Sequence, residues 1–402
     1  MKKILINVFL LLMMATSCHH HDDPFPVGED HIVERTVIVY MAAENSLSSF
    51  ARSDSSEIAR GLSAITDDYN LILYKDDVKM PVIYWMTARK GILKWMQYKK
   101  DQDSADSTIM LSTLREIIKA FPAHHYGLVL WSHANGWVPR IDLSQDAESN
   151  SQSTRRTWGI DNNYNSLGNV GSEMEITALR WVLGQLPRMD YILFDACFMQ
   201  NIESAYELRD VADYLIGSPA EIPGYGAPYT RIMESMMKAD AVNIAEQYYQ
   251  GYQNSSGVAL SIIDCLELEN LATATARYLP KICTSGNMID TEGVQNYVPY
   301  DGGFLWRPEG YDMKSFMHKH LEADDFENWL QALNRAVPYS KATYSWATQY
   351  HGLHNRLTDP DNFSGIAMFI PNTKYESSQN NWNEAFRRTS WYKVAGWAKT
   401  GW

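Results

Sequence analysis

Short apolar runs recur along this chain and alternate with segments that carry apolar residues at helical spacing. Uninterrupted runs of this kind are typical of strands buried on both faces of a sheet. We expect strands at 36–42, 70–75, 82–86, 126–131, 191–194, 212–217 and 258–263. Because strand and helix patterns follow one another in turn, the chain predicts an α/β fold, with a mostly parallel sheet flanked by helices on both faces.

Helical patterns separate these strands and dominate the last third of the chain. Before residue 266 we expect helices at 53–65, from Asp106 or Ser107 to Pro122, at 176–186, 228–238 and 241–253, and later at 268–279, 313–321 and 326–337. Ser172 and Glu175 have the spacing of a capping box. The pattern divides the chain into an α/β domain at 35–265, a helical subdomain at 266–362 and a closing segment at 363–402. The closing segment contains a strand at 365–371 that we expect to return to the main sheet.

The first residues have the pattern of an export signal. Two lysines precede a short apolar run, and small residues then lead into Cys18. The run is too short for a membrane span, which predicts a signal peptide at 1–17. A cysteine at this place resembles a bacterial lipobox, although leucine is more usual where this chain has Ala15. A lipobox would make Cys18 the lipidated first residue of the mature protein, followed by a polar tether at 18–34. The alternative is an ordinary secretory signal with an incidental cysteine.

Two aspartates soon after Cys18 resemble the export signals of surface lipoproteins in some Gram-negative anaerobes. We therefore expect an exported protein, lipid-anchored to the bacterial outer membrane on its periplasmic side or at the cell surface. The net charge of −13 argues against nucleic acid as a partner. Thirteen tryptophans also raise a carbohydrate-binding alternative, but no sugar-binding motif accompanies them.

Two candidate catalytic residues directly follow buried strands. Asp195 and Cys197 come after the strand at 191–194, and His133 comes after the strand at 126–131. Since parallel strands end at one edge of a sheet, a thiol and an imidazole can face each other there as nucleophile and base. We also expect a helix directly after Cys197, whose N-terminal dipole would favour the thiolate. The alternative for Cys197 is a small buried hydrophobe.

Three segments resemble the clostripain family of cysteine peptidases, relatives of caspases, gingipains and legumain. They are VYMAAENSL, FPAHHYGLVLWSHANGW and DYILFDACFMQNIESAYEL, and the resemblance covers roughly residues 36–237. It implies a caspase-like fold, a catalytic domain at 35–265, and a cysteine endopeptidase with a dyad of His133 and Cys197. It also implies that Asp195 lies at the base of the substrate pocket, so that protein or peptide substrates are cut after Arg, with Lys as an alternative.

The oxyanion would be bound by backbone N–H groups at Ala134 and Cys197. The family usually has glycine where this chain has Ala134, which leaves a second function open. That alternative is a weak or inactive peptidase-like lipoprotein that binds peptides or a partner in the same cleft.

A polar stretch at 138–170 contains Arg140, Arg155 and Arg156. The resemblance implies that the protein activates itself by cutting this loop, at Arg155 or Arg156 with Arg140 as a third option. The alternative is a surface loop that is never cut. We expect no cofactor and no metal ligands. Some members of the family depend on calcium, and the acidic residues form no recognisable calcium loop here, so calcium dependence stays open.

Overall fold

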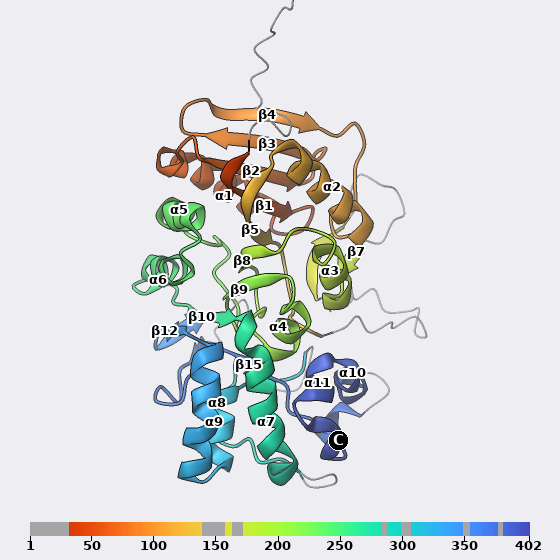
Figure 1. The fold of residues 1–402 in the computed structure, drawn as a ribbon, viewed down its shortest axis with the longest axis vertical. Helices are drawn as coiled ribbons and strands as arrows, with labels where there is room; N and C mark the ends of the chain where they lie inside the picture. Colours follow the sequence, from red (N-terminus) through yellow and green to blue (C-terminus); the bar gives the residue numbers. More distant parts are fainter. Residues whose placement is uncertain are drawn as a thin grey trace, which may run out of the picture.

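The computed structural model describes residues 32–138, 157–162, 172–283, 288–298, 307–348, 354–376 and 381–402. In this part of the chain, nine strands form one sheet in the order β12-β10-β9-β8-β5-β1-β2-β3-β4 (Figure 1). Their bounds are β1 Val33–Ala42, β2 Tyr69–Asp76, β3 Val82–Thr87, β4 Gly91–Gln97, β5 Ala123–Trp131, β8 Met189–Asp195, β9 Ala212–Gly217, β10 Ala259–Asp264 and β12 Tyr339–Ala342. Three small two-stranded sheets pair β6 Trp158–Asp161 with β7 Ser172–Met174, β11 Tyr311–Asp312 with β15 Ala367–Met368, and β13 Ser345–Ala347 with β14 His354–Arg356.

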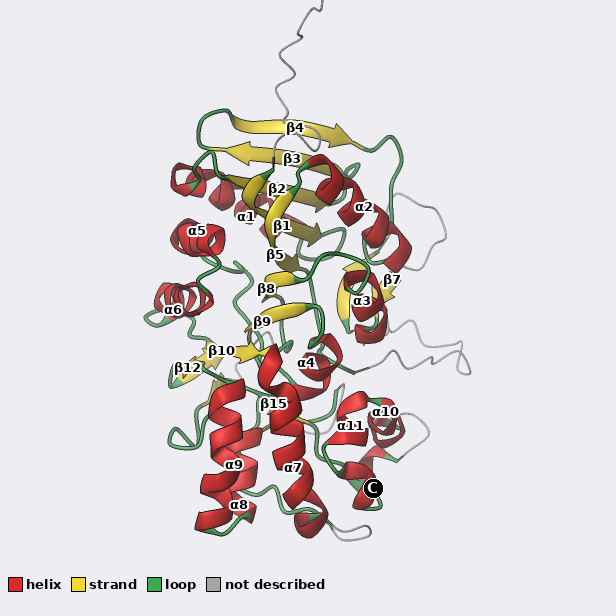
Figure 2. Cartoon of the chain, viewed as in Figure 1, coloured by secondary structure: helices red, strands yellow, loops and turns green. Residues whose placement is uncertain are grey.

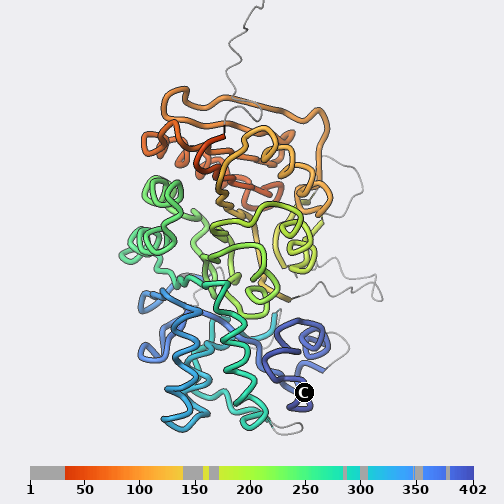
Figure 3. The backbone as a smooth tube through the Cα atoms, viewed as in Figure 1, coloured from red at the N-terminus to blue at the C-terminus, as the bar shows by residue number. Residues whose placement is uncertain are grey.

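The centre of the main sheet is parallel. Strands β9, β8, β5, β1 and β2 run in one direction, and antiparallel pairings add β10 and β12 at one edge and β3 and β4 at the other. The α/β class and the mostly parallel sheet expected from the sequence are therefore confirmed. The chain starts at the central strand β1 and adds β2, β3 and β4 toward one edge. It then adds β5, β8, β9, β10 and β12 in turn on the other side of β1, and the colours of Figure 3 follow this second half toward blue.

Helices cover both faces of this sheet (Figure 2). Their bounds are α1 Ser48–Arg60, α2 Ser107–Ala120, α3 Ile176–Leu183, α4 Ile202–Leu208, α5 Tyr229–Lys238, α6 Ala241–Tyr252, α7 Leu268–Ile282, α8 Met313–His320, α9 Ala323–Ala336, α10 Trp382–Arg388 and α11 Ser390–Val394. Alternation along β1 sends Val37 and Val39 into the apolar cluster with α1, α5 and α6, whereas Ile38 and Tyr40 join the cluster with α2, α3 and α4. Side chains of one strand therefore belong to two separate cores.

The structure corrects several local expectations. The strand expected at 365–371 does not return to the main sheet, because β15 pairs with β11 instead, and β12 takes the edge place beside β10. Ser172 lies in β7 opposite Asp161, so it does not cap α3. The sequence analysis missed β4, because this edge strand is half-exposed and its apolar residues are not continuous.

Cys265 and Cys283 are both buried free thiols, as their spacing along α7 predicts. Among the described residues, no helix is both long enough and apolar enough to cross a membrane. The predicted signal peptide, Cys18 and most of the tether lie outside the described residues, and the domain boundaries stay predictions.

A close approach between β5 and β8 offers a test of the core. Gly127 pairs in register with Tyr191, and a Cβ on Gly127 would lie 2.6 Å from the buried tyrosine ring. We expect Gly127→Ala to lower the free energy of unfolding by about 1–3 kcal/mol, because an extra methyl group overpacks this site. Denaturant unfolding measures the loss. The loss should shrink in a Tyr191→Leu background, and an equal loss in both backgrounds would contradict the contact.

Candidate active site

The parallel pairing of β5 with β8 sets the geometry of the site. Trp131 and Asp195 are partners in this register, and each ends its strand. His133 follows Trp131 by two residues, and Cys197 follows Asp195 by two residues. Because neighbouring strands lie about 4.8 Å apart, the two predicted catalytic residues lie side by side just beyond the carboxyl ends of β5 and β8.

His133 lies in a loop that is held from two sides. Its Nε2 atom is 2.8 Å from the Oγ atom of Ser46, which lies in the turn after β1. On the other side, the N–H of Gly159 donates to the His133 carbonyl, and the N–H of Asn135 donates to Thr157. Ala134 is the central residue of this bridge with β6, and its own N–H points away from β6.

Cys197 is half-buried and carries a protonated thiol at neutral pH. Burial raises the pKa of Cys197 to about 12, and the nearby Glu221 carboxylate adds to the shift. The N–H of Ile222 donates to the sulfur at 3.5 Å, which only partly offsets the cost of forming a thiolate there. The expectation of a thiolate favoured by a helix N-terminus was wrong, because α4 begins at Ile202, five residues later.

The residue after Cys197 has a strained backbone. Phe198 adopts a φ of 61°, a left-handed conformation that costs a bulky residue about 1–3 kcal/mol. Two hydrogen bonds hold it: its N–H donates to the Ala220 carbonyl at 2.9 Å, and its carbonyl accepts from the Asn201 side chain at 2.8 Å. Such strain persists only where the surroundings fix it, which is common at active sites.

The loop of His133 packs directly against the loop of Cys197. Gly136, with a φ of 69°, lies so close that a Cβ there would be 2.5 Å from the Asn201 amide and 2.8 Å from the Phe198 carbonyl. Glycine is therefore required at this contact. The contact ties together the two segments that carry the candidate base and nucleophile.

Asp195 lies behind Cys197 and is almost completely buried, with 3% of its surface exposed. Its Oδ2 atom accepts from the N–H of Ala227 at 3.0 Å and from the hydroxyl of Tyr229 at 2.7 Å. Its Oδ1 atom has no hydrogen-bond partner among the described residues. Burial raises the pKa of Asp195 to about 6, although the hydrogen bonds from Ala227 and Tyr229 and the nearby Tyr248 hydroxyl favour the carboxylate.

A second buried acid, Asp54, belongs to the same group of side chains. It accepts from the indole N–H of Trp131 at 2.8 Å, and burial with the negative charge of Asp195 raises its pKa to about 8. Gly226 lies against both acids, since a Cβ there would be 2.7 Å from Asp195 and 3.0 Å from Asp54. The sequence analysis missed Asp54, yet it shares one helical face with buried Ala51 and Ile58, and a carboxylate on an apolar face is unusual.

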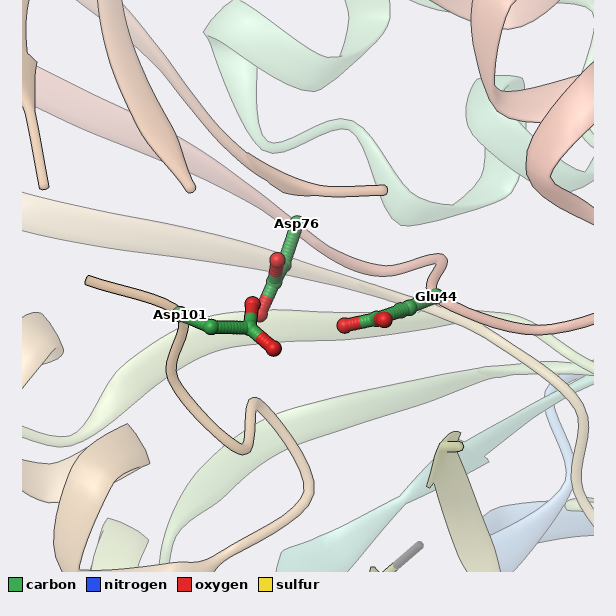
Figure 4. A group of neighbouring side chains, drawn as sticks. All are labelled: Glu44, Asp76 and Asp101. Atoms are coloured by element: carbon green, nitrogen blue, oxygen red, sulfur yellow. The ribbon is translucent and has the colours of Figure 1, made fainter. Parts of the chain in front are cut away.

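Two further places have the chemistry of binding sites. Glu44, Asp76 and Asp101 bring their carboxylates within 4.8 Å of one another and could hold a metal ion (Figure 4). A separate cavity of about 460 Å³ lies between α4 and α10. Neither His133 nor Cys197 lines this cavity, so we assign it no part in the chemistry of Cys197.

Among the residues predicted from the sequence, the structure brings His133, Ala134, Asp195 and Cys197 to one edge of the sheet. Arg140, Arg155, Arg156 and Cys18 lie outside the described residues. Residues that the sequence analysis did not select are Ser46, Asp54, Phe198, Glu221 and Gly226, because their places depend on contacts between distant segments.

Comparisons with known proteins agree with this arrangement. The family model described as the clostripain family matches residues 39–402. The chain is similar to a secreted C11 cysteine protease from Bacteroides thetaiotaomicron, solved in complex with an irreversible peptide inhibitor, at 30% identity and a TM-score of 0.75 over 91% of this chain and 99% of that one. No curated protein matches the chain.

Two other solved structures are also similar. One is an inactive zymogen C11 protease from Parabacteroides distasonis, at 26% identity and a TM-score of 0.74, over 91% of this chain and 99% of the other. The second is a cysteine protease from B. fragilis, at 34% identity and a TM-score of 0.52, over 59% of this chain and 98% of its own. Both the family model and the solved structures lead to one assignment: this chain belongs to the clostripain family of cysteine peptidases, with a caspase-like fold, and is a hydrolase that acts on peptide or protein substrates.

Proposed function

We propose that this chain is an endopeptidase that cuts after Arg, with Lys as an alternative, through a dyad of His133 and Cys197. The observation that carries the specificity is the buried carboxylate of Asp195, whose Oδ1 atom has no hydrogen-bond partner among the described residues. A buried anion of this kind is costly unless a cation completes its hydrogen bonds. The guanidinium group of a substrate arginine has donors of the right charge and geometry.

Asp54 supports a cationic ligand as well. Because the pKa of Asp54 is raised to about 8, it is largely protonated at pH 7, and Asp195 carries the negative charge of the pair. An arriving cation would favour ionisation of both acids. Gly226 leaves the space beside them free of a side chain, since any Cβ there would meet both carboxylates.

The proposed reaction follows from the positions of His133 and Cys197. His133 takes the proton of the Cys197 thiol, and the sulfur attacks the substrate carbonyl while backbone N–H groups at Ala134 and Cys197 bind the oxyanion. The imidazolium then donates its proton to the leaving amine, which gives a thioester that water hydrolyses. Ser46 contacts His133 and helps to orient its ring.

Two further parts of the proposal concern activation and location. The raised pKa of Cys197 fits a resting form, and we propose that cleavage at Arg155 or Arg156, or otherwise at Arg140, activates the protein. We also propose export with a lipid anchor on Cys18 at the outer membrane, which the lipobox-like sequence supports. One similar protease from Bacteroides thetaiotaomicron is described as secreted.

Substrate preference tests the pocket. Fluorogenic peptides ending in Arg, Lys, Asn or Asp should be cut after Arg and Lys, and Cys197→Ala should abolish all cleavage. Asp195→Asn should lower kcat/KM for Arg peptides by about 10²-fold or more, because a buried ion pair loses one partner. The matched control is Asp210→Asn, since this carboxylate is 59% exposed and its ion pair with Arg180 contributes little.

Other outcomes would separate the parts of the proposal. Cleavage after Asn or Asp would retain the dyad and reject the Asp195 pocket. If wild-type protein cuts nothing although gel analysis finds the 138–170 loop cut, the peptide-binding alternative gains support. An intact loop in an active protein, unchanged by Arg155→Ala and Arg156→Ala, would reject self-activation at these residues.

Acid should weaken binding of basic peptides. Below about pH 6 the Asp195 carboxylate takes up a proton, so its attraction for a guanidinium group is lost as pH falls. With Cys197→Ala protein, which leaves an Arg peptide uncut, we expect the Kd from calorimetry to rise about tenfold between pH 7 and pH 5. In the double variant with Asp195→Asn the Kd should be weak and flat, and an equal rise there would point to another group.

Thiol labelling tests the protonation of Cys197. Because burial and Glu221 raise the pKa of this thiol to about 12, the rate of alkylation of the uncut chain by iodoacetamide should rise steadily from pH 7 to pH 10. Mass spectrometry follows the Cys197 peptide, and buried Cys265 and Cys283 serve as slow internal controls. A rate that already levels off below pH 8 would mean a thiolate at neutral pH.

A further inference from the structure

Four carboxylates line the cavity between α4 and α10, which lies apart from His133 and Cys197. The cavity has a volume of about 460 Å³, which is enough for a small organic molecule. Its acids come from the residue before α3, from α4 and from α10, and they are Glu175, Glu203, Glu207 and Glu384. Arg388 is the single basic residue among the described residues that line the cavity. The lining therefore favours a positively charged ligand.

The positive charge of Arg388 is already paired at the rim. Its Nη2 atom lies 3.2 Å from the Oε1 atom of Glu384, one turn earlier on α10, and its side chain is 77% exposed. This pair compensates the charge of Glu384. The two acids of α4 are therefore left without a counter-charge among the described residues that line the cavity.

Glu203 is the most deeply buried of these acids. It has no exposed surface, its Oε1 atom accepts from the N–H of Phe369 at 2.8 Å, and its Oε2 atom has no hydrogen-bond partner among the described residues. Burial raises the pKa of Glu203 to about 8, although the Phe369 N–H and the positive charge of Arg307 favour the carboxylate. Arg307 does not line the cavity, and its guanidinium group lies over the ring of Phe198 at 3.7 Å. A ligand N–H would complete the hydrogen bonds of the Glu203 carboxylate.

The acids of the cavity are too far apart to hold one metal ion. Glu207 lies one helical turn after Glu203, and its Oε1 atom accepts from the N–H of Ser390 at 2.7 Å, so both carboxylates of α4 are fixed by backbone groups of the closing segment. Among the described residues, the acids of this cavity form no group of three with ligand atoms within 4.8 Å of one another. A metal ion needs several oxygen ligands around one point, whereas one organic molecule can carry positive charges at separate points.

Two indole rings give the cavity its apolar surface. Trp137 and Trp382 line it and are both buried, and Trp137 is held in place by ring contacts with Phe369 and Phe386 at 5.1 Å and 5.8 Å. Methylene groups pack well on rings of this kind, and indole also attracts ammonium groups. The lining thus combines separated negative charges with an aromatic surface.

We propose that this cavity binds a linear polyamine, a flexible chain in which methylene groups separate several ammonium groups. One ammonium group donates to the Oε2 atom of Glu203, and the methylene groups pack on the indole rings. Another ammonium group lies near Glu175, which is exposed at the open end of the cavity. Because α4 and the closing segment both supply lining residues, the ligand stabilises the contact between these two parts of the chain.

Calorimetry with the full chain measures this binding without any peptidase activity. Spermidine should bind, and at millimolar concentration it should raise the Tm by several degrees. 1-Butylamine, which carries a single ammonium group, should bind at least about tenfold more weakly. Glu203→Gln should raise the Kd for spermidine about tenfold or more, because a hydrogen bond to a buried charge is lost. The matched control is Glu234→Gln on α5, whose carboxylate is 65% exposed, and it should leave the Kd unchanged.

Proton release is a readout that a merely structural role of Glu203 would not change. Because its pKa is about 8, Glu203 is mostly protonated at pH 7, and an adjacent ammonium group would lower that pKa and release a proton. The heat of spermidine binding at pH 7 should therefore depend on the ionisation enthalpy of the buffer. This dependence should vanish in Glu203→Gln.

Contrary results overturn defined parts of the proposal. Wild-type protein that shows no heat of binding and no rise in Tm with spermidine would reject the site, and equal binding of 1-butylamine would reject a polyamine. An unchanged Kd in Glu203→Gln would reject these ligands. If that variant does not fold, Glu175→Gln gives the comparison with an expected severalfold rise in Kd, since this exposed side chain makes no capping hydrogen bond. Loss of binding in Asp195→Asn would place the amine in the proposed substrate pocket, whereas an unchanged Kd there separates this site from the proposed function.

Discussion

The parallel pairing of β5 with β8 is the constraint on which the rest of the site depends. It places Trp131 beside Asp195, so that the loops of His133 and Cys197 begin at the same level along the strand direction. The close packing of Gly136 on Phe198 and Asn201 then locks the two loops together. The strain in Phe198 persists because the sheet below and the hydrogen bonds from both sides leave its backbone no alternative.

The same sheet edge gathers buried negative charge in two places, on opposite faces of the sheet. Asp54 and Asp195 lie on the face covered by α1 and α5, and Asp76 follows the side chains of Ile72 and Tyr74 on the face covered by α2. Buried anions raise one another's pKa values, and each group gains most from a cation. On the face that carries Asp54 and Asp195, the basic side chain of a substrate, as proposed above, would supply such a cation.

The state of Cys197 bears on the activation proposed above. Its thiol is held neutral by burial and by Glu221, in the loop between β9 and α5 that also supplies the hydrogen bonds from Ile222 and Ala227. This one loop therefore contacts both the proposed nucleophile, Cys197, and the Asp195 carboxylate. A rearrangement of this loop would change the protonation of Cys197 and the position of the Asp195 carboxylate together, which fits the resting form proposed above.

The sequence by itself determined the strands of the parallel centre and the two residues that follow them, His133 and Cys197, because buried strands leave continuous apolar runs and their ends are marked by polar residues. It did not determine the partner of β15, the place of Ser172 or the strand β4, since edge pairings depend on long-range contacts and leave little local pattern. Only the tertiary structure decided the raised pKa of Cys197, the pairing of Asp54 with Asp195 and the meeting of Glu44, Asp76 and Asp101. Burial and the approach of charges from distant segments are properties of the folded chain, and no local motif records them.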